Sequence, residues 1–125
     1  MTRTVLLLIL VNVAMTSLAQ IVLKVGMSAP EVVRSLSGAV RPGHLVGVLF
    51  HPWVMAGLVL YFGAALIWLI VLSRIEVSLA YPFVGLGFVV TMLLGWSLLG
   101  ETLSLPRLLG TLMIVGGVVV LAHSG

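Results

Sequence analysis

The sequence predicts an all-α membrane protein with four transmembrane helices joined by short loops, and three observations lead to this fold class. Of the 125 residues, 62% are hydrophobic and only 7% are charged, whereas a soluble domain carries about 25% charged residues. A soluble fold of this length could not bury so much apolar surface. The apolar runs are also continuous rather than alternating, which is typical of membrane helices and not of membrane strands.

The composition excludes several classes of function. The chain has no cysteine, so disulfides and thiolate chemistry are impossible. Its net charge of +3 is spread along the loops and forms no patch for a nucleic acid. The three carboxylates and three histidines are dispersed, so we expect no catalytic constellation, no metal site and no cofactor. The protein is therefore not expected to be an enzyme.

We expect a single domain over residues 1–125. Its four predicted spans cover residues 4–26, 52–73, 77–100 and 105–123. The first span is long enough to cross a bilayer, and Gly26 and Pro30 end it. Its apolar run continues past a signal-like Ser17-Leu18-Ala19 sequence, so we expect a retained helix rather than a cleaved signal peptide.

The remaining elements follow from amphipathic spacing, aromatic anchors and proline. Residues 30–40 place apolar side chains at helical spacing opposite polar ones, which predicts one short helix on the membrane surface. Trp53 and Trp68 lie near the two ends of the second span, as interfacial anchors do. Pro82 falls in the first turns of the third span, where it can kink the helix, and Ser104 can cap the fourth.

A polar stripe runs along the first span. Its members recur every fourth residue and are Asn12, Thr16, Gln20 and Lys24. Residues four apart lie nearly above one another on a helix. A cation within hydrocarbon costs about 2.5–3.5 kcal/mol or more unless it snorkels, pairs or lines a wet cavity. The stripe is therefore expected to face something other than lipid tails.

Small residues on the last span favour an assembly of more than one chain. Gly110 and Gly117 are seven residues apart and share one helix face, which allows close approach of another helix. Packing inside the bundle is the alternative use of this face. Four short helices can scarcely enclose a polar pathway alone, so we expect a homodimer or a heterodimer with a similar four-helix subunit.

Short motifs recur in a fixed order through residues 65–121. They read Val-Ser-Leu-Ala-Tyr-Pro at 77–82, Gly-Glu at 100–101, Leu-Gly at 109–110 and Ile-Val-Gly-Gly at 114–117. Together they resemble the small four-helix branch of the drug/metabolite transporter superfamily, which includes EamA-like and small multidrug resistance-like proteins. This resemblance implies a multi-pass transporter of the bacterial inner membrane.

Within that superfamily, the Ala-Gln at 19–20, Lys24 and the Tyr-Pro at 81–82 resemble the ArnE/ArnF group. These are the paired subunits of the aminoarabinose-phosphoundecaprenol flippase, so the resemblance implies a lipid flippase in lipopolysaccharide modification. Small multidrug exporters instead carry a proton-binding Glu in the first helix. Thr16 takes that position here and cannot titrate, so a proton-coupled exporter of lipophilic cations is a poor fit.

The flippase hypothesis assigns a role to each candidate site residue. Lys24 would pair with a lipid phosphate, and Gln20, Thr16 and Asn12 would bind sugar hydroxyls deeper in the membrane. Snorkelling of Lys24, and interhelical hydrogen bonds of the other three, are the alternatives.

Three further residues complete the candidate site. Glu101 could pair with Lys24 or Arg107, cap the turn, or accept a sugar's amino group. Tyr81 would lie at the opposite membrane face, beside a hinge or portal at Pro82. The residues leave two other functions open, namely export of a small polar or cationic metabolite and a non-transporting subunit of a larger complex.

Overall fold

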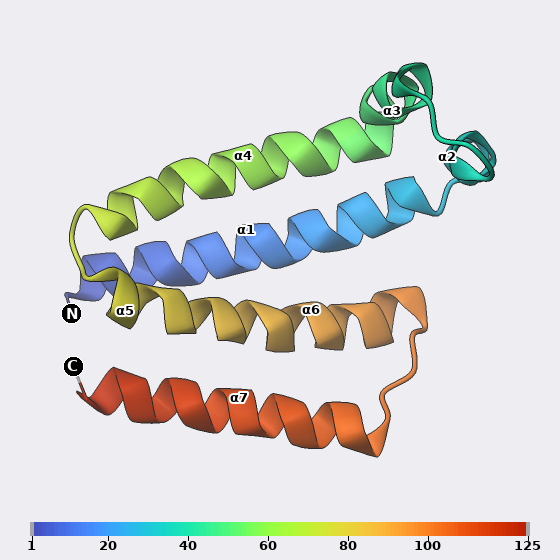
Figure 1. The fold of residues 1–125 in the computed structure, drawn as a ribbon. Helices are drawn as coiled ribbons and strands as arrows, with labels where there is room; N and C mark the ends of the chain where they lie inside the picture. The colour runs from blue at the N-terminus through green and yellow to red at the C-terminus, as the bar shows by residue number, and fades with distance from the viewer. Residues whose placement is uncertain (1, 125) are drawn as a thin grey trace.

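The computed structural model describes residues 2–124, which form helices and connecting turns throughout (Figure 1). The elements are α1 (Arg3–Met27), α2 (Pro30–Leu36), α3 (Pro42–Leu49), α4 (Pro52–Leu72), α5 (Val77–Ala80), η1 (Tyr81–Phe83), α6 (Val84–Leu99) and α7 (Leu105–Ser124). Four spans are long and apolar enough to cross a membrane, with α5, η1 and α6 together forming the third. Each end lies within one residue of its predicted position, and the all-α, four-span fold class is confirmed.

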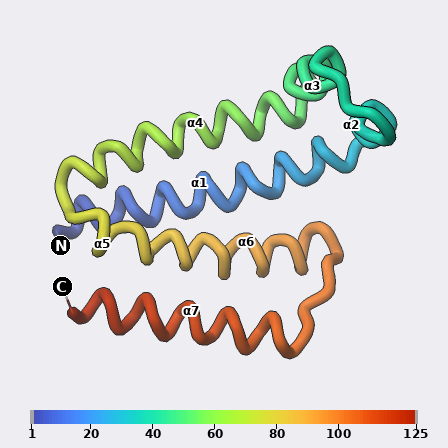
Figure 2. The backbone as a smooth tube through the Cα atoms, in the orientation of Figure 1, coloured from blue at the N-terminus to red at the C-terminus, as the bar shows by residue number. Residues whose placement is uncertain are grey.

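The four spans lie side by side, with α1 in the interior of the array. The backbone trace shows α4 on one side of α1 and α6 on the other, while α7 lies beyond α6 (Figure 2). The contact between α1 and α4 is the most extensive in the described chain. It is close because Gly57 has no side chain, since a Cβ there would come within 2.7 Å of the Leu23 Cγ atom. The first helix is thus the element on which α4 and α6 pack, while α7 packs on α6.

Two apolar clusters hold the spans together at opposite ends. Val5, Ile9 and Val13 of α1 pack with Val71 of α4 and Phe83 of η1 in the larger cluster. A smaller cluster at the other end joins the loop helices to the start of α4; its buried members are Val32, Val48 and Val54. In a soluble protein, removing an aliphatic or aromatic side chain from water stabilises the fold by about 1.5–3 kcal/mol. Between helices in a membrane, close packing provides much of this stabilisation instead.

The first loop forms two short helices rather than the one that the sequence predicts. Gly38 has a positive φ of 89°, which ends the path of α2, and Pro42 occupies the first turn of α3, where its missing N–H costs nothing. Glu31 of α2 lies 3.5 Å from the Nε2 atom of His51, which caps α4. A backbone hydrogen bond holds the pKa of the Glu31 carboxyl below its usual value, with smaller contributions from His51 and Arg34.

The third span is interrupted where the sequence predicts that Pro82 disturbs it. Residues 81–83 tighten into a 3-10 turn between α5 and α6, because proline lacks the N–H that a regular α-helix needs. The Tyr81 ring packs edge-on against Trp68 of α4, with ring centroids 6.4 Å apart. At its other end, α6 stops at Gly100, whose φ of 69° is a conformation that glycine adopts readily.

The last span is the least enclosed of the four. Val118 is the residue of α7 that is buried within the described chain. A Cβ added at Gly110 or Gly117 would meet nothing within 4 Å among the described residues. The glycine face that the sequence indicates for packing is therefore open in the single chain.

Candidate functional site

A groove of about 600 Å³ lies between α1, α4 and the η1–α6 segment. Throughout the following text, "the groove" means this cavity, whose polar lining consists of Asn12, Thr16, Ser17, Gln20, Tyr61, Tyr81, Thr91 and Glu101. Small-molecule sites commonly occupy about 300–1,000 Å³. Gln20, Tyr61 and Phe88 line the groove and are exposed, so the groove is open on one side.

Three members of the predicted polar stripe line the groove, and one does not. Asn12, Thr16 and Gln20 face it, whereas Lys24 is exposed and lies outside its lining. The reason is helical geometry, because each four-residue step overshoots a full turn by about 40°. After three steps Lys24 has rotated by about 120° from Asn12. The role of Lys24 as a phosphate partner stays a prediction.

The polar groups in the middle of the groove are already used in packing. The Asn12 Nδ2 atom donates a hydrogen bond of 2.5 Å to the Ala64 carbonyl of α4. The Ser17 hydroxyl donates one of 3.3 Å to the Gly87 carbonyl of α6. The Thr16 hydroxyl donates to the carbonyl of Asn12 within its own helix. Two hydrogen bonds therefore tie α1 to both walls of the groove.

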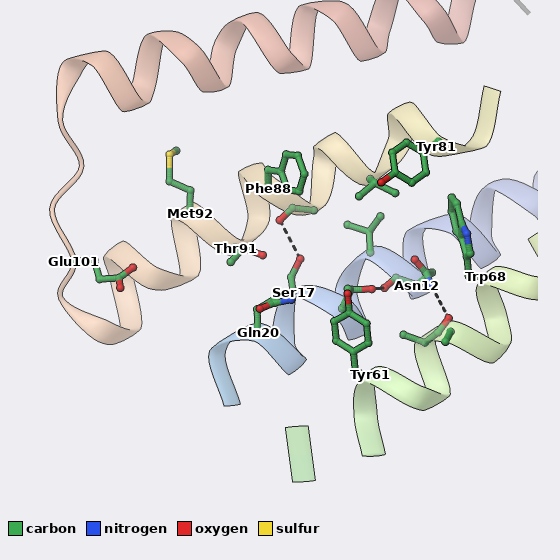
Figure 3. A pocket seen from close by; sticks show the side chains of 16 residues that line it. Asn12, Ser17, Gln20, Tyr61, Trp68, Tyr81, Phe88, Thr91, Met92 and Glu101 are labelled. Atoms are coloured by element: carbon green, nitrogen blue, oxygen red, sulfur yellow. Dashed lines mark hydrogen bonds between the residues drawn. The ribbon is translucent and has the colours of Figure 1, made fainter. Parts of the chain in front are cut away.

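Other polar side chains of the groove have no such partner. Within residues 2–124, the side chains of Gln20, Tyr61, Thr91 and Glu101 form no hydrogen bond to the protein. Gln20 and Thr91 come from α1 and α6 and lie in the middle of the view, with Glu101 toward the α6–α7 turn (Figure 3). These groups offer donors and acceptors to a polar ligand.

The position of Glu101 follows from the end of α6. Gly100 turns the chain in a left-handed conformation, and the Glu101 N–H donates to the Gly95 carbonyl at 3.2 Å. The carboxylate then folds back over α6, where a Cβ at Gly95 would collide with its Oε1 atom. The bare backbone at Gly95 thus makes room for the Glu101 carboxylate.

The opposite end of the groove is aromatic. Tyr81 and Trp68 line it there, and Phe88 lies between that end and Thr91 (Figure 3). Pro82 is not part of the lining but forms the 3-10 turn that carries Tyr81. Whether this turn acts as a hinge or portal stays a prediction.

The remaining predicted site residues lie outside the groove. The Arg107 Nη1 atom donates a hydrogen bond of 2.8 Å to the Thr102 carbonyl in the α6–α7 turn. Among the described residues, neither Arg107 nor Lys24 forms an ion pair with Glu101. The pairing that the sequence leaves open for Glu101 is therefore not made within the described chain.

Several lining residues were not predicted as site residues from the sequence, among them Tyr61, Trp68 and Thr91. Tyr61 and Trp68 are seven residues apart on one face of α4, with Ala64 and Ala65 between them. This spacing, with small residues between two amphipathic rings, is the signal that could have identified the wall. Thr91 was not recognised as a site residue because it forms a small-residue repeat with Gly87, and such a repeat is equally typical of simple helix packing.

The fold and the groove together define a small multi-pass membrane protein of the transporter type. Residues 49–114 match the family described as Small Multidrug Resistance protein, and no solved structure matches the chain significantly. The chain belongs to the Small Multidrug Resistance protein family. It is a multi-pass protein of the bacterial inner membrane, because four apolar spans accompany membrane-transporter relatives from bacteria.

Several curated relatives carry one name, "Probable 4-amino-4-deoxy-L-arabinose-phosphoundecaprenol flippase subunit ArnE". The chain is 33% identical to the one from Erwinia tasmaniensis over 88% of its own length and 95% of the relative. It is 32% identical to one from Pseudomonas aeruginosa over 94% of its length and 96% of the relative. A match of 36% to one from Pseudomonas fluorescens covers 58% of this chain and 63% of that protein.

Proposed function

We propose that this chain is a subunit of a flippase that moves a polyprenyl-phosphate-linked aminosugar between the leaflets of the bacterial inner membrane. The observation that carries the proposal is the groove, in which uncommitted polar groups from α1, α4, α6 and the following turn face one another. Full-length likeness to relatives named as such flippase subunits supports the substrate class. On this proposal residues 1–125 act as one four-helix unit that transports and does not catalyse.

The groove suits a ligand with a polar head and an apolar tail. The α4 and α6 helices both pack on α1, which leaves the groove open between them. A headgroup can hydrogen bond to Gln20 and Thr91 while its polyprenyl tail stays in lipid. Asn12 and Thr16 shape the middle of the path, and Tyr81 borders the far end.

Two basic residues near one end of the groove complete the proposed path. Lys24 and Arg107 lie outside the groove but on the membrane face where α1 ends and α7 begins. There they attract the lipid phosphate before or after it passes through the groove. Pro82 provides the break in the third span that lets the far end widen. These roles rest on position and charge.

A partner subunit is part of the proposal. The relatives are named as subunits, and the open glycine face of α7 offers a surface for a similar four-helix chain. A second copy of this chain or a related chain would fit this surface. Gly110 and Gly117 are the residues assigned to that contact.

Two groove variants test the proposal. Gln20→Leu and Thr91→Val keep the approximate volume of each side chain but remove hydrogen-bonding groups. We expect each to reduce leaflet-resolved translocation of the lipid-linked sugar by about tenfold, the loss of one or two useful hydrogen bonds. Ser97→Ala is the control, because Ser97 is exposed on α6 and outside the groove. Normal translocation by both groove variants would refute the proposal.

The exporter alternative has its own test. Thr16 replaces the titratable group on which proton coupling in such an exporter depends, and its hydroxyl already bonds to the Asn12 carbonyl. Thr16→Ala should therefore leave any pH dependence of transport unchanged. If this variant abolished proton-coupled drug exchange in proteoliposomes, the exporter function would replace the flippase.

A further inference from the structure

The groove contains one formal charge, and that charge is negative. Glu101 is the ionisable carboxylate among the lining residues, while Lys24, Arg34 and Arg107 are outside the lining. The ion pair found among the described residues joins His51 and Glu31 in the first loop. The Glu101 carboxylate is thus available to a ligand, at the end of the groove nearest the α6–α7 turn (Figure 3).

The local backbone folds this carboxylate back over α6, where it lines one end of the groove while Glu101 stays accessible from outside. The left-handed Gly100 and the hydrogen bond from the Glu101 N–H to the Gly95 carbonyl reverse the chain. Gly95 is buried, and its missing side chain leaves the space that the carboxylate occupies. A cap that served only to end α6 would need Gly100 and the backbone bond, but not a carboxylate folded back over Gly95.

We propose that Glu101 is the specificity-determining residue of the groove and recognises a protonated amine on the headgroup. The inference rests on the proposed function and deepens it by naming the feature of the headgroup that is selected. An ammonium group forms charge-assisted hydrogen bonds to a carboxylate. Gln20 and Thr91 supply neutral donors and acceptors for the adjacent hydroxyls. Gly95 is a positioning residue, because it determines where the carboxylate lies.

Two probes that differ in one charge test the proposal. The first is polyprenyl phosphate carrying a 4-amino-4-deoxypentose, and the second is the same lipid with its amine acetylated. Binding of each is measured on the full chain in nanodiscs by native mass spectrometry and competition. We expect the wild type to prefer the amine probe by about tenfold or more, as a hydrogen bond to a charged group allows.

Glu101→Gln should remove this preference, because it should weaken binding of the amine probe and leave binding of the acetylated probe unchanged. Glu76→Gln is the matched control, since Glu76 is exposed and lies at the opposite end of the third span, outside the groove. Gly95→Ala keeps the charge but displaces the flexible end of Glu101, so it should reduce the preference. In the Glu101→Gln background it should reduce the preference no further, because interacting sites are non-additive.

The outcomes separate this inference from the function on which it rests. If the wild type binds both probes equally, or if Glu101→Gln keeps the preference for the amine, the role of Glu101 is refuted and the flippase proposal stands. If the wild type binds neither probe, the proposed function fails, and the inference fails with it. Preference that is lost in Glu101→Gln and retained in Glu76→Gln supports the inference.

Discussion

Replacing Asn12 by leucine tests how far one polar contact holds the groove together. Asn12 is buried, with 8% of its surface exposed, and its Nδ2 atom donates to the Ala64 carbonyl of α4. Leucine has a similar size and cannot donate. Interhelical hydrogen bonds in membranes average about 0.6 kcal/mol and reach about 1.7 kcal/mol. Because this bond is buried, we expect Asn12→Leu to lower the free energy of unfolding by about 1 kcal/mol.

The measurement is reversible unfolding of the purified protein in mild bicelles, followed by steric trapping or by titration with a denaturing detergent. Thr16→Val is the matched control, because the Thr16 hydroxyl bonds within α1 and joins no second helix. The control should change stability by less than about 0.5 kcal/mol. If Asn12→Leu proved as stable as Thr16→Val, the contact between α1 and α4 would not depend on this bond, and Asn12 would be free for a ligand.

Three other predictions concern the surface of the chain. Lys24→Gln should reduce translocation of the lipid-linked sugar only a few-fold, because an exposed ion pair contributes at most about 1 kcal/mol. Lys24→Arg should retain more activity than Lys24→Gln. Wild-type activity in Lys24→Gln would leave Lys24 as a snorkelling anchor. Gly117→Leu should weaken association of the subunits several-fold by blocking close approach at α7. Unchanged crosslinking between subunits would show that this face contacts lipid and not a partner. Glu31, whose pKa is lowered from its usual 4.5, should stabilise the docking of α2 above that value and lose this effect as the pH falls through the lowered pKa. Hydrogen-exchange protection factors of residues 30–36 should therefore fall in acid, and Glu31→Gln should abolish the transition; a transition that persists in the variant would assign it to another group.

Hydrophobicity and proline placed the four spans correctly because a bilayer sets the length of a helix so strongly. Pro82 produced an interruption in the expected turn, since the loss of an N–H acts locally. The first loop was less predictable. A run of apolar residues at helical spacing indicated one helix over residues 30–40, whereas that helix already ends at Leu36 and a second helix, which was not predicted, begins at Pro42.

The groove was predictable from α1 and from its two ends, because Tyr81 and Glu101 were also expected to be site residues and both line it. Asn12, Thr16 and Gln20 stand out because polar residues are costly in lipid, and all three line the groove. Lys24 follows the same spacing, but the slow rotation of the stripe carries it out of the lining. The α4 wall was not predicted, because Tyr61 can be an ordinary residue of an apolar span and only its spacing from Trp68 indicates a shared face.

The two hydrogen bonds from α1 to its neighbours also bear on how the protein is made. Asn12 and its acceptor are 52 residues apart in the chain, and Ser17 and its acceptor are 70 apart. At a synthesis rate of about 5–20 residues per second, the first acceptor follows Asn12 after about 3–10 s and the second follows Ser17 after about 4–14 s. During that interval α1 must hold its polar stripe in the translocon or the bilayer without these partners. The apolar residues around the stripe, which give the span a mean hydropathy of 2.3, let the helix insert before the walls of the groove have been synthesised.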